Sequence, residues 1–331
     1  MKVKPETYKN LIAVQDNKII NIPNRILRKA STKDQQNKNL TKQSVCIVCN
    51  FRFLENKIKW SKKIKAICHP FRDDSIFPEN IDKYLFSESD FCDKLTTDIK
   101  SRSDKWDNMK YDFVYFTLNS KEGTRSKGIY MLPLLDKVAG HLKLKGLVID
   151  YATRETKKHE GTIYHTASKI IKSKINSFKN LKIIKNSYST KEVCAIMLAS
   201  KFIFLPSTAD ASPRILVEAL VRNRPLVVNS SIYGGWKYIN DNNGAFFDGP
   251  SIEEFVDNNY KKKYEKYLTD AIEKVLSIDN SKISKNFYSK YGFVKSSKKL
   301  ASIINSITGK DYEAVAFKEW EKPLEKSFLK K

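Results

Sequence analysis

Two turns, each between an apolar stretch and the helical segment that follows it, carry residue types able to bind a phosphate group. The first, at 117–128, reads TLNSKEGTRSKG and places Arg125 and Lys127 beside Gly128. Cations and flexible backbone directly before a helix form a phosphate-binding arrangement, because the first helical N–H groups have no partner within the helix. A solvated polar loop is the alternative for this segment, and its composition alone does not separate the two.

The second turn, at 206–218, reads PSTADASPRILVE and predicts a helix start. Ser212 is a favoured N-cap residue and Pro213 is favoured at the first helical position, so unpaired N–H groups follow Asp210 directly. Those groups suit a phosphate. Glu218 lies further along the helix in an apolar stretch, where a carboxylate costs free energy unless it has a partner. Ribose or sugar hydroxyls would be such a partner, and a neighbouring basic residue is the alternative.

The elements that must position these turns follow a regular pattern from residue 111 onward. Short apolar segments alternate with segments of helical periodicity, which predicts βαβ units and a parallel sheet covered on both faces. The expected strands are 112–118, 146–151, 181–185, 202–205, 225–229 and 245–247, and the expected helices are 129–141, 162–178, 190–199, 213–221 and 236–239. In such a sheet, ligands bind beyond the carboxyl ends of the strands, where both turns lie.

Taken together, the motifs of 202–247 resemble the donor-binding half of the group 1 (family 4) GT-B glycosyltransferases. The order and spacing of many pieces carry the resemblance. The matching residues are Pro206-Ser207, Asp210-x7-Glu218, Pro213-Arg214, Ala219-Leu220, the segment 225–228 (PLVV), Gly234-Gly235 and Asn243-Gly244. Lys127-Gly128 is similar to the Lys-Gly that follows the first strand of this domain in that family.

The resemblance implies a role for each matching residue. Glu218 would hold the ribose hydroxyls of a nucleotide sugar, and Asp210 would bind the sugar ring. Lys127 would neutralise the departing diphosphate, and either Arg125 or Lys121 would take the place of a second cation, the family's arginine. The other expected nucleotide-sugar contacts are Gly128, Ala211, Ser212, Pro213, Arg214, Ile215, Gly234 and Gly235. The family implies retention of the anomeric configuration, and we expect neither a metal nor a cofactor, with the nucleotide diphosphate sugar itself as donor substrate.

Two features depart from the family pattern. The first acid of the pair is Asp210 rather than a glutamate, and Glu122 stands where the family commonly has an arginine.

On the acceptor side, His69 follows an apolar strand in ICHPFRDD and is a candidate catalytic contact from the N-terminal domain. A structural histidine at a strand end is the alternative.

The resemblance also implies the fold class. We expect an α/β protein of the GT-B type with two Rossmann-like domains, the N-terminal one short and atypical. The expected parts are an N-terminal hairpin and linker at 1–42, an acceptor-side domain at 43–110, a nucleotide-sugar-binding domain at 111–309 and a helical tail at 310–331. The tail has one apolar side, which either docks on the rest of the chain or binds a membrane surface.

Composition and charge limit the classes of partner. The chain has 331 residues, 41% of them hydrophobic, which excludes global disorder. It lacks the ~18 consecutive apolar residues of a spanning helix and an apolar N-terminal signal, so we expect a cytoplasmic protein, with attachment to a membrane surface as the alternative. The net charge is +24, and residues 1–65 carry +12 of it. Such an excess attracts phosphate-rich partners, although a solvated lysine-rich surface is the alternative.

The five cysteines give no clear metal motif. Cys46 and Cys49 form a C-x-x-C, but no second close pair follows, and the run SVCIVCNF also fits a buried strand. We therefore predict a structural role for them.

We conclude that the sequence favours a glycosyltransferase that transfers a sugar from a nucleotide sugar to an acceptor that the sequence does not identify. The basic N-terminal half would suit an anionic acceptor, such as a nucleic acid with modified bases, a phosphorylated glycan or a membrane lipid. A catalytically degenerate relative that binds nucleic acid or membrane is the second hypothesis. An epimerase on the same sheet is disfavoured, because no G-x-G-x-x-G fingerprint opens the chain.

Overall fold

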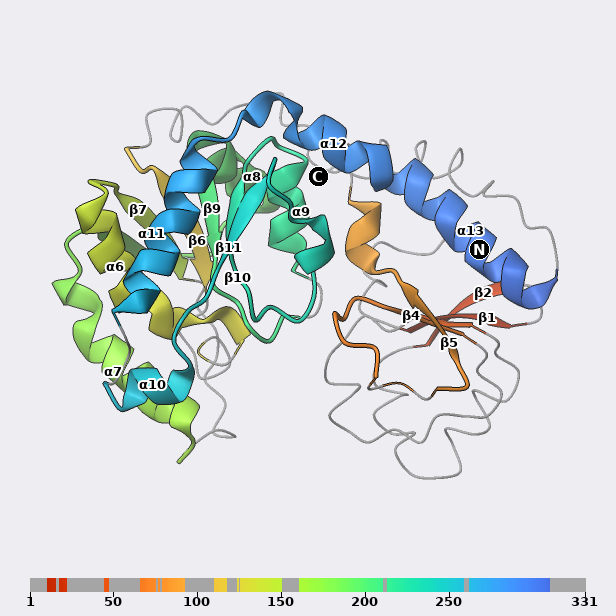
Figure 1. Cartoon of the computed structure of the whole chain (residues 1–331), viewed down its shortest axis with the longest axis horizontal. Coiled ribbons are helices and arrows are strands. Elements are labelled where there is room, and N and C mark those ends of the chain that lie inside the picture. Colours follow the sequence, from red (N-terminus) through yellow and green to blue (C-terminus); the bar gives the residue numbers. More distant parts are fainter. Residues whose placement is uncertain are drawn as a thin grey trace. The chain divides into compact units, whose positions relative to one another are not determined.

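The chain folds into two compact units in the computed structural model (Figure 1). The first comprises Met1–Asp93, Ala211–Arg214 and Tyr288–Lys331, and the second comprises Lys94–Asp210 and Ile215–Phe287. The structure describes residues 11–15, 18–22, 45–47, 66–75, 77, 79–92, 110–117, 124, 126–150, 161–210, 213–258 and 262–309.

The second unit contains a six-stranded sheet in which every strand pair is parallel. Its order is β11-β10-β9-β6-β7-β8, so chain order reverses direction between β6 and β9. The strands are β6 (Phe113–Thr117), β7 (Gly146–Asp150), β8 (Leu181–Lys185), β9 (Phe202–Leu205), β10 (Leu226–Asn229) and β11 (Gly244–Phe247). The parallel α/β sheet expected from the alternating pattern is therefore confirmed.

Helices cover this sheet on both faces (Figure 1). One face carries α6 (Leu132–His141), α7 (Ile163–Lys174) and α11 (Lys263–Leu276), and the opposite face carries α8 (Thr190–Ala199) and α9 (Arg214–Leu220). The shorter elements are η4 (Ile129–Met131), η6 (Ile175–Ser177), η7 (Trp236–Tyr238), α10 (Ile252–Val256) and η8 (Asn280–Lys282), and α12 (Ile283–Lys290) follows. A capping box fixes the start of α8, because Ser189 and Glu192 each bond the backbone of the other.

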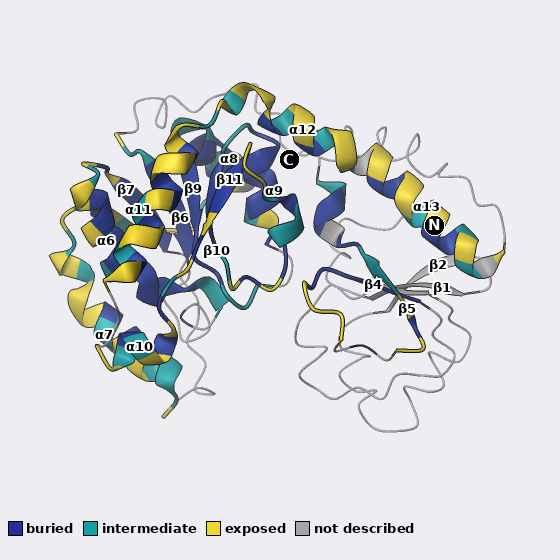
Figure 2. Ribbon diagram, viewed as in Figure 1, coloured by how far each residue is buried: buried dark blue, intermediate teal, exposed yellow. Residues whose placement is uncertain are grey.

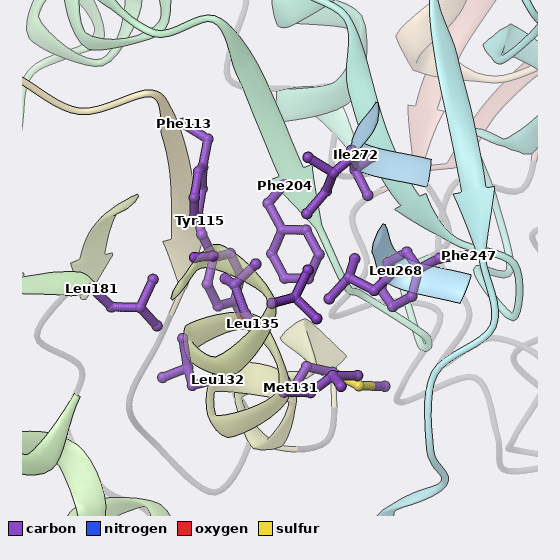
Figure 3. Packing of buried hydrophobic residues seen from close by; sticks show 14 of the residues in the cluster. Phe113, Tyr115, Met131, Leu132, Leu135, Leu181, Phe204, Phe247, Leu268 and Ile272 are labelled. Atoms are coloured by element: carbon purple, nitrogen blue, oxygen red, sulfur yellow. The ribbon is translucent and has the colours of Figure 1, made fainter. Parts of the chain in front are cut away.

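Aromatic rings from alternate strand positions fill the core under α6 and α11 (Figure 3). Phe113 stacks on Phe202 with ring centroids 5.1 Å apart, and Phe204 stacks on Phe247 at 5.4 Å. All four side chains are buried. Rings packed in this way link β6 to β9 and, across β10, β9 to β11, so the loops at these strand ends start from fixed positions.

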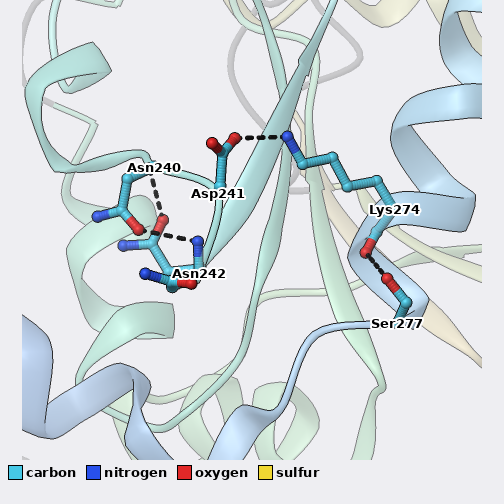
Figure 4. Close-up of polar contacts among 6 residues, drawn as sticks. Asn240, Asp241, Asn242, Lys274 and Ser277 are labelled. Carbon is cyan, nitrogen blue, oxygen red and sulfur yellow. Dashed lines mark hydrogen bonds and ion pairs between the residues drawn. The ribbon is translucent and has the colours of Figure 1, made fainter.

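The turn that leads into β11 is closed by its own side chains (Figure 4). The Asn240 N–H donates to Asn243 Oδ1 at 2.9 Å, and the Asn242 N–H donates to Asn240 Oδ1 at 3.0 Å. Lys274 of α11 adds an ion pair with Asp241 at 2.5 Å. The Asn-Gly pair seen in the sequence thus shapes the entry to an edge strand.

The first unit contains a five-stranded sheet of order β2-β1-β3-β4-β5. Its strands are β1 (Leu11–Gln15), β2 (Lys18–Ile22), β3 (Val45–Ile47), β4 (Ala66–His69) and β5 (Asp82–Leu85). The expected hairpin is present, since β1 runs antiparallel to β2. It is not a separate appendage, because β1 also pairs with β3 and so extends the sheet at one edge.

The long helix α13 (Phe293–Thr308) packs in the first unit. Ile303 contacts the cluster of Cys68 and Phe86, and Ser296 Oγ donates to the Asp90 carbonyl of η2 (Glu88–Phe91) at 2.6 Å. The buried face of α13 alternates with an exposed one along its length (Figure 2). The expected domain at 111–309 differs here, because the second unit ends at Phe287 and α13 groups with the N-terminal strands.

Two expectations lie outside the described residues, namely the helical tail at 310–331 and Cys49 of the C-x-x-C. Among the residues that the structure does describe, no helix combines the length and apolar character needed to span a bilayer.

We expect Ile303→Ala to destabilise the first unit by about 2–4 kcal/mol, because it removes a buried side chain from the cluster beneath α13. Hydrogen–deuterium exchange in β4 should become faster, while exchange in β6 of the second unit stays unchanged. The exposed Ser302 of the same helix provides the control, and Ser302→Ala should leave both rates unchanged. Faster exchange in β6 alone would contradict the assignment of α13 to the first unit.

Candidate functional site

The carboxyl ends of β6 and β9 lie next to each other at the point where the strand order reverses. The two strands pair directly, Phe113 with Phe202 and Val114 with Ile203. The chain leaves them in opposite directions, and such a switch point is where ligands bind in sheets of this kind. Both turns identified in the sequence start at these two strand ends, so the sheet brings them together.

Lys127 and Asp210 meet above this point, although 83 residues separate them in the sequence. The Lys127 ammonium group forms an ion pair with the Asp210 carboxylate. The two side chains are 31% and 16% exposed, so the pair is open to solvent on one side. A cation and a carboxylate that meet at a switch point can contact a charged ligand there.

Gly128 brings the two loops into direct backbone contact. Its φ is +68°, and a Cβ atom at this position would lie 2.3 Å from the Pro206 carbonyl oxygen. Real Cβ atoms do not approach an oxygen so closely, so only glycine fits between the start of η4 and the end of β9. The contact between Gly128 and Pro206 therefore determines the distance between Lys127 and the loop that carries Asp210.

The loop after β10 supports Asp210 from its other side. The Gly234 N–H donates to the Asp210 carbonyl at 3.0 Å, and the Tyr233 N–H donates to the Thr208 carbonyl at 3.2 Å. Gly235 follows as the N-cap of η7. The structure thus brings the Gly234-Gly235 turn to the same strand end as Lys127 and Asp210.

Ser207 is a buried polar side chain directly after β9. It is fully buried, and its hydroxyl has no hydrogen-bond partner among the described residues. Buried hydroxyl groups almost always have a partner, which makes Ser207 a candidate contact for a ligand or a water at this strand end. Ser207 belongs to the Pro206-Ser207 motif but is not among the site residues expected from the sequence, because the burial of a hydroxyl after a strand depends on the loops around it.

Tyr130 adds an electrostatic feature beside the same loop. Burial raises its pKa to about 12, and the Thr208 side chain acts on it in the opposite direction. The phenol is therefore neutral at physiological pH and presents a hydroxyl, not a charge, to the loop between β9 and α9.

Helix α9 begins at Arg214 and carries Glu218. Glu218 is only 8% exposed, and its backbone carbonyl accepts a hydrogen bond from Arg222 Nη1 at 2.5 Å. Pro213 is buried, Arg214 is exposed and Ile215 is half-buried. Three of the expected site residues, Arg125, Ala211 and Ser212, lie outside the described residues.

His69 lies at the end of β4 in the first unit and is 3% exposed. Its ring stacks near Phe71, with centroids 6.2 Å apart, and lies 4.9 Å from the Phe77 ring. An imidazole enclosed by two buried phenylalanines has the surroundings of a core side chain. Catalytic contact by His69 remains a prediction from the sequence.

The described residues include no group of three or more His, Cys, Asp or Glu side chains placed to hold a metal ion.

No family model matches the sequence, and neither does any curated protein. Solved structures do match. HepE from Anabaena in complex with UDP and glucose superposes with a TM-score of 0.57 at 11% identity, over 82% of this chain and 74% of that one. Sucrose-phosphate synthase from Thermosynechococcus elongatus gives 0.54 at 8% identity, over 86% and 66%. The chain has the GT-B fold.

A third GT-B structure, the pneumococcal O-GlcNAc transferase GtfA in complex with UDP and GlcNAc, gives a TM-score of 0.50 at 13% identity. The match covers 90% of this chain and 52% of GtfA, so the chain spans about half the length of that protein. The resemblance to the group 1 GT-B glycosyltransferases is thereby confirmed at the level of the fold. In this GT-B chain, the six-stranded second unit carries the motifs on which the resemblance rests.

We expect Gly128→Ala to lower the free energy of unfolding by at least about 2 kcal/mol, since it adds a clash with Pro206 to the strain of a positive φ. Gly161→Ala is the matched control, because Gly161 has a φ of +78° and open space where its Cβ would be. The control should cost only the backbone strain, about 1–2 kcal/mol. Calorimetric unfolding of both variants measures the difference, and equal losses would show that the Pro206 contact is unimportant.

Proposed function

We propose that this chain is a glycosyltransferase that transfers a sugar from a nucleotide diphosphate sugar to an anionic acceptor. The observation that carries the proposal is the Lys127–Asp210 pair at the β6–β9 switch point of a GT-B fold. The buried hydroxyl of Ser207, in the same loop after β9 as Asp210, has no partner among the described residues and supports a ligand at this strand end. HepE and GtfA were both solved with UDP, which makes a UDP-sugar the first donor to test.

In the proposed reaction, the donor diphosphate lies against Lys127, with Arg125 as a second cation. The bond between the anomeric carbon and the diphosphate oxygen breaks, and its electron pair stays on that oxygen. A bond from an acceptor oxygen to the anomeric carbon forms, and the proton of the acceptor hydroxyl passes to the departing diphosphate oxygen. Cations and helix N–H groups fixed in advance stabilise the charge that develops on the diphosphate, so the site residues themselves can supply this stabilisation.

The remaining residues take the donor's other parts in this proposal. Glu218, buried in α9, binds the ribose hydroxyls, and Asp210 binds the sugar ring once the diphosphate draws Lys127 away from it. The backbone of 211–215 and the Gly234-Gly235 turn line the rest of the donor site. A buried carboxylate suits a diol, because two hydroxyl donors replace the water that it loses.

Charge favours an anionic acceptor. The first unit holds 29 Lys and Arg against 16 Asp and Glu, a net charge of +13. Residues 94–210 add a net +11, whereas residues 215–287 are neutral, with ten residues of each sign. The excess is thus absent from the C-terminal half of the second unit. A positive field over the first unit would attract a nucleic acid, a phosphorylated glycan or anionic lipids.

Glu218→Gln should weaken UDP binding about 30-fold or more, because it removes the charged acceptor for the ribose hydroxyls while it keeps the side-chain size.

Lys127→Ala should lower the rate of UDP-sugar hydrolysis about 100-fold or more, because it removes the cation that stabilises the charge on the departing diphosphate. Lys137→Ala is the control for the lysine, since Lys137 forms an ion pair with Glu265 on the α6 face. Calorimetric titration with UDP and a UDP-release assay measure these effects.

Wild-type activity in both variants would refute the site assignment. Failure of the wild-type chain to bind UDP, GDP, ADP or TDP, or to hydrolyse their sugars, would instead support a catalytically degenerate binding protein.

Binding to an anionic acceptor should depend steeply on salt. We expect affinity for an anionic polymer or an anionic vesicle to fall at least 10-fold between 50 and 300 mM NaCl, because bound counterions are released on association. Sedimentation with DNA, with polyphosphate and with vesicles containing phosphatidylserine would identify the class. Salt-independent binding would exclude an electrostatic acceptor site.

A further inference from the structure

Tyr115 carries a hydroxyl group into the apolar core of the second unit. Its side chain is fully buried, and its ring meets Phe204 edge-on at 5.7 Å. The positions around it on the same sheet face are Phe113, Phe202 and Phe247. A buried hydroxyl costs free energy unless it is hydrogen-bonded, so a tyrosine here needs a partner that a phenylalanine would not.

That partner is the backbone of the candidate phosphate-binding lysine. The Tyr115 hydroxyl donates to the Lys127 carbonyl oxygen at 2.5 Å. Burial also raises the pKa of the Tyr115 phenol far above its ordinary value, so the hydroxyl keeps its proton and remains a donor. Tyr115 stands within β6 and Lys127 follows in the turn after it, so the hydrogen bond ties this turn back to the strand that precedes it.

The turn is consequently held on two sides. Tyr115 holds the carbonyl of Lys127, and the next residue, Gly128, rests against the Pro206 carbonyl. With its backbone fixed at both places, Lys127 reaches Asp210 with its ammonium group. Without the Tyr115 hydroxyl, the Gly128 contact would still hold the turn against β9 but would leave the Lys127 peptide group free to rotate.

We propose that Tyr115 is a positioning residue for Lys127: its hydroxyl fixes the backbone from which the lysine meets Asp210 and, if the proposed function holds, the donor diphosphate. Displacement of a catalytic group by even about 1 Å can cost a large factor in rate. Tyr115→Phe keeps the ring and its packing, so it removes this hydrogen bond while the core stays filled.

A double-mutant cycle on UDP affinity tests the link, with the wild type, Tyr115→Phe, Lys127→Ala and the double variant. We expect Tyr115→Phe alone to weaken UDP binding about 5- to 20-fold, and to change affinity less than 2-fold when Lys127 is already alanine. Tyr264→Phe is the matched control. Tyr264 is also buried, but its hydroxyl bonds the Glu254 carboxylate of α10 at 2.9 Å, so its loss should leave UDP affinity unchanged.

A second measurement needs no nucleotide. The rate at which acetic anhydride acetylates Lys127, read by mass spectrometry, reports how well the ion pair with Asp210 protects the amine. We expect Tyr115→Phe to raise this rate at least 3-fold and Tyr264→Phe to leave it unchanged, with acetylation of Lys137 as the internal reference. An unchanged Lys127 rate in Tyr115→Phe overturns the inference.

The outcomes separate this inference from the proposed function. If the wild type binds no nucleoside diphosphate, the proposed function fails, and the acetylation rates still decide the role of Tyr115. If UDP binds and Tyr115→Phe weakens it equally with and without the Lys127 side chain, the hydroxyl acts through the fold as a whole and the inference is wrong.

Discussion

The backbone at Gly128 passes so close to the Pro206 carbonyl that no side chain fits between them, and the arrangement of the candidate site depends on this approach. It joins the loop after β6 to the loop after β9 at the one place in the six-stranded sheet where chain order reverses. A wider gap would separate Lys127 from Asp210, because each side chain extends from one of these loops. The backbone contact between Gly128 and Pro206 therefore determines the distance between the two loops, and the Lys127–Asp210 ion pair depends on that distance.

Aromatic rings in the core beneath α6 and α11 supply the rigidity that this backbone contact requires. Stacked rings link β6 to β9 and β9 to β11, so the strand ends cannot shift independently. Interiors packed at this density resist small displacements. Polar groups lie at the carboxyl ends of the strands, next to the aromatic rings of the core. The Tyr115 hydroxyl is hydrogen-bonded to the turn after β6, and Ser207 is buried directly after β9. The transition from apolar core to polar site takes place within one or two residues of each strand end.

The sequence predicted the parts whose signal is local. The strand at 181–185 and the helix at 190–199 have the expected bounds, because the change from a short strand-like segment to helical periodicity is visible in the local sequence. The assignment of α13 could not be predicted, since an apolar helix face does not identify the sheet that it covers. The hydrogen bond from the Tyr115 hydroxyl to the Lys127 carbonyl could not be predicted either. It depends on the path of the loop after β6, and the composition of that loop indicates only that it is polar.

The exposure of the Lys127–Asp210 pair decides whether it can be part of a binding site. A fully buried pair would cost several kcal/mol to separate, because each charge would lose its partner without regaining water. At 31% and 16% exposure, both groups retain contact with solvent, and pairs of this kind contribute about 1 kcal/mol or less. A diphosphate, with at least two negative charges, can therefore displace one carboxylate from the lysine at little cost. The ion pair holds Lys127 in place without a ligand and yields readily to one, which is what a preorganised anion site requires.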